Sequence, residues 1–151
     1  MQPPLSVSMQ QQAKQNVEIL IVEDDEDDVF LLRRALRLTA ASTLCGINIR
    51  HAKNGVDAIS MISRSDSFDQ LPNLVIVDLN MPLLDGVGFL HALRKTPQLS
   101  DICAIVLTTS DQTSIQNEAR LAGADDVFVK PETLAELTEI ATRIFSAAGW
   151  A

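Results

Sequence analysis

Five side chains with metal-binding or phosphoryl-transfer chemistry follow short apolar runs in this 151-residue chain. They are Glu23, Asp24, Asp78, Thr108 and Lys130. Carboxylates that are held close together repel one another unless a cation lies between them, and Mg²⁺ prefers oxygen ligands of this kind. An aspartate can also attack a phosphorus atom and form an aspartyl-phosphate, whose charge a metal ion and an ammonium group stabilise. The residue types therefore indicate Mg²⁺-assisted phosphoryl transfer, provided that the fold brings them together.

The apolar pattern predicts a fold that does so. Short apolar runs, typical of strands covered on both faces, alternate five times with helical patterns. We expect strands near 17–22, 47–51, 74–77, 102–107 and 127–129, and helices near 29–36, 56–62, 87–95, 113–121 and 133–147. This order predicts an α/β fold of the flavodoxin-like (βα)5 type, a doubly wound parallel sheet with strand order 2-1-3-4-5. In such sheets the ligand site lies beyond the carboxyl ends of the strands, here between the first and the third.

The five residues can be assigned roles at that edge of the sheet. We expect Asp78 to accept the phosphoryl group. Lys130 is placed to bring an ammonium group to the carboxylates or the phosphoryl oxygens, and Thr108 can offer its hydroxyl group. A magnesium site is expected from Asp24, Asp78 and the backbone carbonyl of Asn80, with Glu23 acting partly through water.

Two neighbouring features carry further expectations. Lys130 precedes Pro131, and we expect a cis peptide bond that shapes a tight turn there. The acidic run continues after Asp24 through Asp28, and we interpret 26–28 as the solvated start of a helix, because carboxylates favour helix N-termini.

Composition limits the classes of function. Twelve basic and 20 acidic residues give a net charge of −8, which argues against a nonspecific nucleic-acid or anionic-membrane binder. The apolar runs are too short to span a membrane, and residues 1–16 lack a secretory signal, so we expect a cytoplasmic protein with a flexible tail (1–16) and one domain (17–151). Cys45 and Cys103 lack metal-ligand spacing and are expected to be buried thiols.

Across nearly all of 17–147 the chain resembles the receiver domain of bacterial two-component response regulators. The resemblance is carried by Ile19-Leu20-Ile21-Val22-Glu23-Asp24, by Val77-Asp78-Leu79-Asn80-Met81-Pro82 with Asp85-Gly86, by Thr108 and by Lys130-Pro131. It implies that Asp78 takes its phosphoryl group from the phosphohistidine of a sensor histidine kinase. It also implies Mg²⁺ at Glu23, Asp24, Asp78 and the Asn80 carbonyl, and slow autodephosphorylation of a protein that is not a conventional turnover enzyme.

Within that family, the acidic run 23–29, the segment 107–111 and the lack of an output domain look similar to single-domain regulators paired with phytochrome kinases. The resemblance therefore implies a bacterial phytochrome as the kinase. It also implies a homodimer through the face of the fourth helix, fifth strand and fifth helix, which phosphorylation would alter.

One departure from the family pattern keeps other functions open. Val127 stands three residues before the lysine, where the family often has a Tyr or Phe, and strand alternation points Phe128 to the opposite face. A phosphorylation-independent interaction module therefore stays an alternative. A phosphohydrolase with an aspartate nucleophile is a second alternative. The resemblance to such enzymes would require Asp-x-Asp here, with the second aspartate as general acid, and Asn80 cannot donate that proton.

Overall fold

A parallel sheet of five strands forms the centre of the molecule. The computed structural model describes residues 15–43, 45–64 and 71–150. The strands are β1 (Gln15–Val22), β2 (Cys45–Ala52), β3 (Leu74–Val77), β4 (Cys103–Thr108) and β5 (Asp126–Val129). The helices are α2 (Glu26–Ala41), α3 (Gly55–Ser63), α4 (Gly86–Lys95), α5 (Thr113–Ala122) and α6 (Leu134–Ala147), with a short 3₁₀ turn, η2 (Pro97–Leu99).

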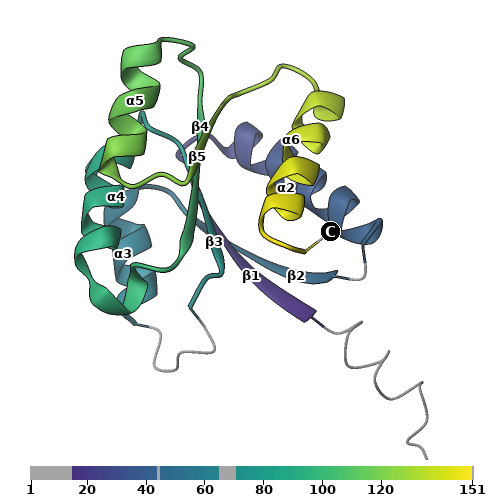
Figure 1. Cartoon of the computed structure of the whole chain (residues 1–151), viewed down its shortest axis with the longest axis horizontal. Coiled ribbons are helices and arrows are strands. Elements are labelled where there is room, and N and C mark those ends of the chain that lie inside the picture. The colour runs from purple at the N-terminus through teal and green to yellow at the C-terminus, as the bar shows by residue number, and fades with distance from the viewer. Residues whose placement is uncertain (1–14, 44, 65–70, 151) are drawn as a thin grey trace, which may run out of the picture.

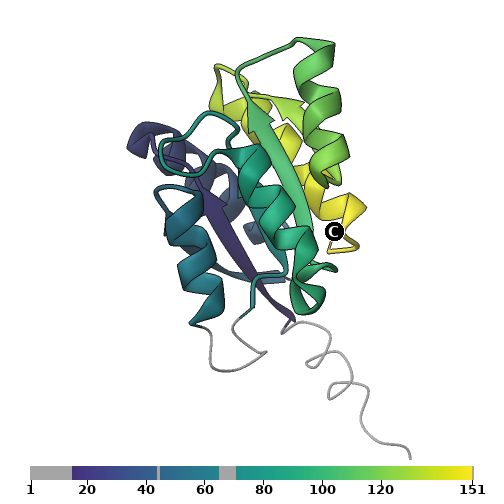
Figure 2. The ribbon, with the colours of Figure 1, turned by 90° about the vertical axis from the view of Figure 1, so that its left-hand side faces the viewer.

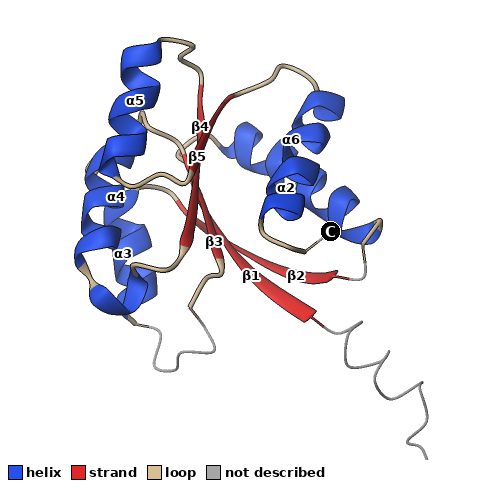
Figure 3. Ribbon diagram, viewed as in Figure 1, coloured by secondary structure: helices blue, strands red, loops and turns tan. Residues whose placement is uncertain are grey.

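The strands lie in the order β2-β1-β3-β4-β5, and all pairs are parallel. Helices cover both faces of the sheet: α3, α4 and α5 lie on one side, and α2 and α6 lie on the other (Figure 1, Figure 3). A view from the side of α3 shows α3, α4 and α5 in front of the sheet (Figure 2). The predicted flavodoxin-like fold and strand order are confirmed.

The continuous apolar runs of the strands follow from this two-sided cover. All four residues of β3 are buried, although successive side chains point to opposite faces. Val75 and Val77 pack in the core beneath α3, α4 and α5, whereas Leu74 and Ile76 pack in the core beneath α2 and α6. A polar residue would therefore be buried at any of these positions, so the run contains none.

Several elements extend beyond the predicted ranges. β1 begins at Gln15 rather than at residue 17, because Gln15 and Asn16 pair with the first residues of β2, Cys45 and Gly46. The rest of the predicted tail, residues 1–14, lies outside the described residues. Both cysteines carry free thiols; Cys45 is buried as expected, whereas Cys103 is only partly buried, so that expectation was wrong for Cys103. In the described part of the chain, none of the helices has the length and apolar composition needed to cross a membrane.

Arg94, in the last turn of α4, holds the amino-terminal end of the sheet together. Its guanidinium group donates hydrogen bonds to the carbonyl oxygens of Gly123 (3.0 Å), Ser100 (2.8 Å) and Ile102 (2.7 Å). It also pairs with Asp125 Oδ2 at 3.0 Å. One side chain thus joins α4, the segment before β4 and the loop between α5 and β5.

We expect Arg94→Met to lower the free energy of unfolding by about 2–3 kcal/mol, because it removes the charged donor of three carbonyl groups, two of them in partly buried contacts, and of a carboxylate. Denaturant unfolding would measure this loss. Arg120→Met is the control, since Arg120 makes a single exposed ion pair with Asp126 at 3.3 Å, and its loss should cost less than about 1 kcal/mol. Equal effects of the two substitutions would contradict the assigned role of Arg94.

Candidate functional site

The backbones of three predicted site residues are fixed by the sheet itself. Each follows the last residue of a strand, and its N–H group continues the hydrogen-bond ladder into the loop. Glu23 N donates to Ala52 O (3.0 Å), Asp78 N donates to Val22 O (3.0 Å), and Lys130 N donates to Thr108 O (2.7 Å). The carboxyl ends of β1, β3 and β5 therefore present these residues at one edge, as the sequence predicts.

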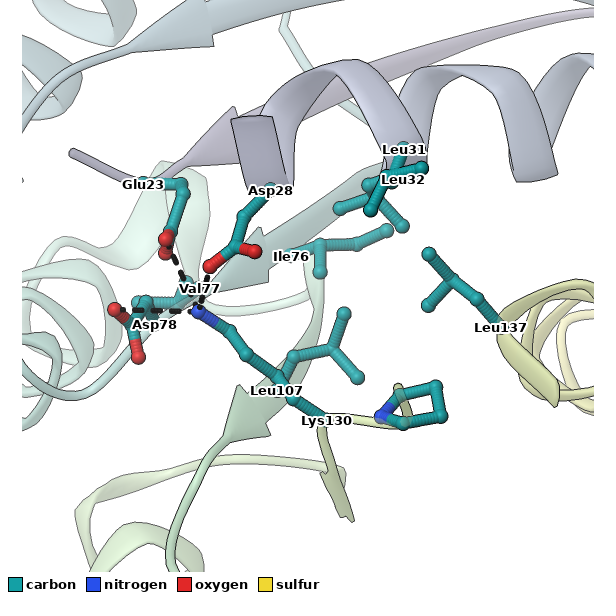
Figure 4. Close-up of a pocket in the computed structure, with 11 residues that line it drawn as sticks. Glu23, Asp28, Leu31, Leu32, Ile76, Val77, Asp78, Leu107, Lys130 and Leu137 are labelled. Carbon is teal, nitrogen blue, oxygen red and sulfur yellow. Dashed lines mark hydrogen bonds and ion pairs between the residues drawn. The ribbon is translucent and has the colours of Figure 1, made fainter. Parts of the chain in front are cut away.

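The side chains converge on one ammonium group. Lys130 Nζ lies 3.0 Å from Glu23 Oε1, 3.0 Å from Asp28 Oδ2 and 3.5 Å from Asp78 Oδ2 (Figure 4). Carboxylate oxygens of Glu23, Asp24 and Asp78 all lie within 4.8 Å of one another. The site thus combines a tight group of carboxylates with a single positive charge from β5.

Burial makes this concentration of negative charge costly. Glu23 and Asp78 are buried, whereas Asp24 is exposed. Burial and the neighbouring Asp78 raise the pKa of Glu23 to about 8, although Lys130 acts in the opposite direction. For Lys130, burial lowers the pKa, but its carboxylate partners outweigh burial and raise the pKa above the usual range. An additional cation would relieve the repulsion that remains between the carboxylates.

The donor set fits a hard divalent cation. Mg²⁺ takes oxygen ligands, commonly one or two carboxylates with waters and phosphate oxygens. The three carboxylates supply such oxygens, and exposed Asp24 keeps the group accessible from solvent. Asn80 is exposed in the loop two residues after Asp78, and the contribution of its carbonyl group stays a prediction.

The loop after Asp78 is held close to the site by Asp85 and Gly86. Asp85 caps α4 by accepting a hydrogen bond from the N–H of Gly88 at 2.8 Å. A Cβ atom on Gly86 would lie 2.5 Å from the carbonyl oxygen of Asp78. Glycine is therefore required for the close approach of α4 to the acceptor residue.

Thr108 ends β4 on the face covered by α3, α4 and α5, and its side chain is fully buried. Its Oγ1 accepts a hydrogen bond from the N–H of Ser110 at 3.1 Å. Val127 is buried on the same face, whereas Phe128 packs on the opposite face, where Arg143 lies 5.7 Å from its ring centroid. The predicted orientation of Phe128 is confirmed, so its ring does not replace the aromatic residue missing at 127.

The expected cis bond between Lys130 and Pro131 was wrong. All peptide bonds of the described residues are trans. The trans form is intrinsically favoured, by about 0.5–1 kcal/mol before proline, and with a trans bond Lys130 still reaches the carboxylates.

Asp28 is a site residue that the sequence analysis missed, because it was assigned to a solvated helix start. Its contact with Lys130 shows otherwise. The signal lies in the helical spacing: Asp28 precedes buried Leu32 by four residues and buried Ala35 by seven, and so continues the inward stripe of α2. A carboxylate on that stripe, one turn after a strand end, faces the site.

His51 was also missed. This residue of β2 has its Nε2 atom 2.7 Å from the backbone oxygen of Glu23. Because a carbonyl oxygen only accepts, Nε2 carries the proton and donates it. The imidazole thereby holds the backbone between Glu23 and Asp24 in place. This contact joins two strands, so the spacing of residues in the sequence does not indicate it.

The five-stranded α/β sheet, with carboxylates, a hydroxyl group and a lysine at one edge, indicates a particular protein family, and sequence comparison supports the same family. Residues 19–142 match the family model of the response regulator receiver domain. The chain belongs to this family: it is a receiver domain of the kind that takes part in two-component signalling, in which sensor histidine kinases supply the phosphoryl group.

Individual relatives differ in how much of their length the chain covers. It is 34% identical over 119 residues to the transcriptional regulatory protein PrrA of Mycobacterium tuberculosis, and the match covers 79% of this chain and 46% of PrrA. It is 31% identical over 134 residues to the probable chemotaxis protein CheY of Rhizobium etli, covering 88% of this chain and 95% of CheY. The chain thus spans about half of PrrA but nearly all of CheY.

Two similar solved structures carry related names. The phosphorylated cyanobacterial phytochrome response regulator RcpA matches with a TM-score of 0.75 and 26% identity, covering 89% of this chain and 94% of RcpA. The Mn²⁺-bound form of response regulator Rcp1 matches with a TM-score of 0.69 and 26% identity, covering 86% and 92%.

The raised pKa of Glu23 predicts a pH dependence of stability without metal. Because the folded state retains a proton that the unfolded state loses above about pH 4.5, stability should fall as pH rises from about 5 to 8. Thermal unfolding in EDTA would measure this fall in the native chain. Glu23→Gln removes the titrating group, so its melting temperature should decline less over the same range; identical declines would contradict the assignment.

Proposed function

We propose that this chain is a phosphorylation-dependent switch that accepts a phosphoryl group at Asp78 in a Mg²⁺-dependent reaction. The observation that carries the proposal is the position of Asp78. Its carboxylate is buried, is clustered with those of Glu23 and Asp24, and lies 3.5 Å from Lys130 Nζ. Such a group of ligands and charges is suited to stabilise a phosphoryl group in transfer.

The reaction begins when one carboxylate oxygen of Asp78 attacks the phosphorus atom of a phosphohistidine. The new P–O bond forms as the P–N bond breaks, and the imidazole leaves with the electron pair of that bond, neutral because its other ring nitrogen carries a proton. Lys130 stabilises negative charge on the transferring oxygens. Thr108 Oγ1 already accepts a hydrogen bond from Ser110 N, so its O–H group is free to donate to a phosphoryl oxygen. Slow attack by water later returns free Asp78 and inorganic phosphate.

Magnesium would be held by Glu23, Asp24, Asp78 and the Asn80 carbonyl group, and would supply Lewis-acid stabilisation of the phosphoryl oxygens. Glu23 and Asp78 would help to position the ion, because their backbone N–H groups continue the hydrogen-bond ladders of the sheet.

The kinase and the responding surface are proposed from the neighbours. RcpA is called a phytochrome response regulator, and the chain covers most of it, which supports a bacterial phytochrome as the histidine kinase that phosphorylates Asp78. The surface proposed to change, and to form a homodimer, is that of α5, β5 and α6. We propose no role in transcription, because the chain spans only about half of PrrA.

Mass spectrometry of the intact protein after incubation with acetyl phosphate and Mg²⁺ tests the proposal. We expect the native chain to gain one phosphoryl group and Asp78→Asn to gain none, because an amide oxygen is a poor nucleophile. Asp101→Asn is the matched control. It also removes one carboxylate, but Asp101 lies just before the first residue of β4, at the edge of the sheet opposite to Asp78. Equal uptake by Asp78→Asn and the native chain would overturn the assignment.

A phosphorylation-independent interaction module is the second candidate, and buried Val127 favours it. This module predicts the same dimer fraction with and without acetyl phosphate in sedimentation experiments. The proposed switch predicts that the fraction changes in the native chain and stays constant in Asp78→Asn. A constant fraction in phosphorylated native protein would support the module instead.

A further inference from the structure

Lys130 has an anionic partner that the proposed phosphoryl-transfer reaction does not use. Asp28 Oδ2, from the first turn of α2, lies as close to Nζ as Glu23 does, at 3.0 Å, whereas Asp78 Oδ2 lies at 3.5 Å. The resting site therefore directs its only lysine more towards α2 than towards the acceptor. The inference below rests on the proposed phosphorylation of Asp78.

A phosphoryl group on Asp78 would reverse this preference. It adds acceptor oxygens and roughly one further negative charge on the side of Lys130 where contact is weakest. An ammonium group has three N–H donors, and two of them already serve Glu23 and Asp28. The third donor faces Asp78, at 3.5 Å, so a phosphoryl group whose oxygens take more than this one donor competes with the two carboxylates for the lysine.

Asp28 is the partner that can be released at low cost. Its side chain is 43% exposed, whereas that of Glu23 is 5% exposed. Water can solvate a released Asp28, and the N-terminus of α2 stabilises its charge. Glu23 has no such access to water and stays with the lysine or a metal ion.

We propose that Asp28 competes with the phosphoryl group for Lys130, and that phosphorylation releases it and alters the first turn of α2. Asp28 is thus a positioning residue, which acts on the reaction through Lys130.

The packing beneath the ion pair allows such a change. A cavity of about 50 Å³ lies between α2, the sheet and α6, below Asp28 and Lys130 (Figure 4). Leu31 and Leu32 of α2 line it on one side, and Pro131 and Leu137 line it on the other. The start of α2 therefore has room to move when its link to Lys130 breaks. A change at α2 of this kind does not require an aromatic residue at position 127.

Titration with the beryllium trifluoride anion, a stable substitute for the phosphoryl group, tests the proposal at saturating Mg²⁺. We expect Asp28→Asn to bind the anion about two- to fivefold more tightly than the native chain, the range that a half-exposed ion pair supplies. Asp27→Asn is the matched control: it removes the same charge from the same turn, and Asp27 makes no ion pair with Lys130. Its affinity should equal that of the native chain.

Hydrogen exchange of the same proteins gives a second readout. The anion should speed exchange at the Val29 N–H, which bonds to Asp25 O in the first turn, in the native chain and in Asp27→Asn but not in Asp28→Asn. Equal or weaker binding by Asp28→Asn would overturn the competition while leaving the proposed function intact. Failure of the native chain to bind the anion would overturn both.

Discussion

Negative charge at the carboxyl edge of the sheet is the constraint on which the site depends. The order β2-β1-β3-β4-β5 places β1 beside β3, so the carboxylates that follow these strands cannot avoid one another. Strands in a sheet are about 4.8 Å apart, so β5 lies roughly 10 Å from β3. A compensating charge from β5 must cross that distance, and the long side chain of Lys130 does so. Its ammonium group offsets part of the charge of the buried carboxylates, so negative charge stays in excess at this edge.

The rest of the fold keeps these groups in place. Ladder bonds continue beyond the strands to the N–H groups of Glu23, Asp78 and Lys130, so little backbone freedom remains at the site. Apolar cores on both faces make the sheet rigid, and Gly86 allows the loop after β3 to pack against Asp78. The change that we propose on phosphorylation is thereby left to the first turn of α2, where a half-exposed ion pair lies over a cavity.

The sequence was sufficient for the architecture and for bringing the three carboxylates and Lys130 to one edge of the sheet, for identifiable physical reasons. Doubly covered strands must be apolar throughout, so β3 was evident from its four residues, and parallel strands place their carboxyl ends together. Asp28 and His51 were missed because their roles come from contacts between segments that are distant in the chain. The isomer of the Lys130–Pro131 bond and the start of β1 depended likewise on local geometry and on pairing with β2.

The clustered carboxylates are proposed to direct phosphorylation to Asp78 and to no other acid. Borohydride reduction of the phosphorylated protein tests this most directly, because it converts an acyl phosphate into an alcohol and thus the modified aspartate into homoserine. Peptide sequencing by mass spectrometry then locates the product. We expect homoserine at position 78 alone, in amounts that depend on Mg²⁺. A reduced side chain at Asp24 or Glu23, with position 78 unmodified, would contradict it.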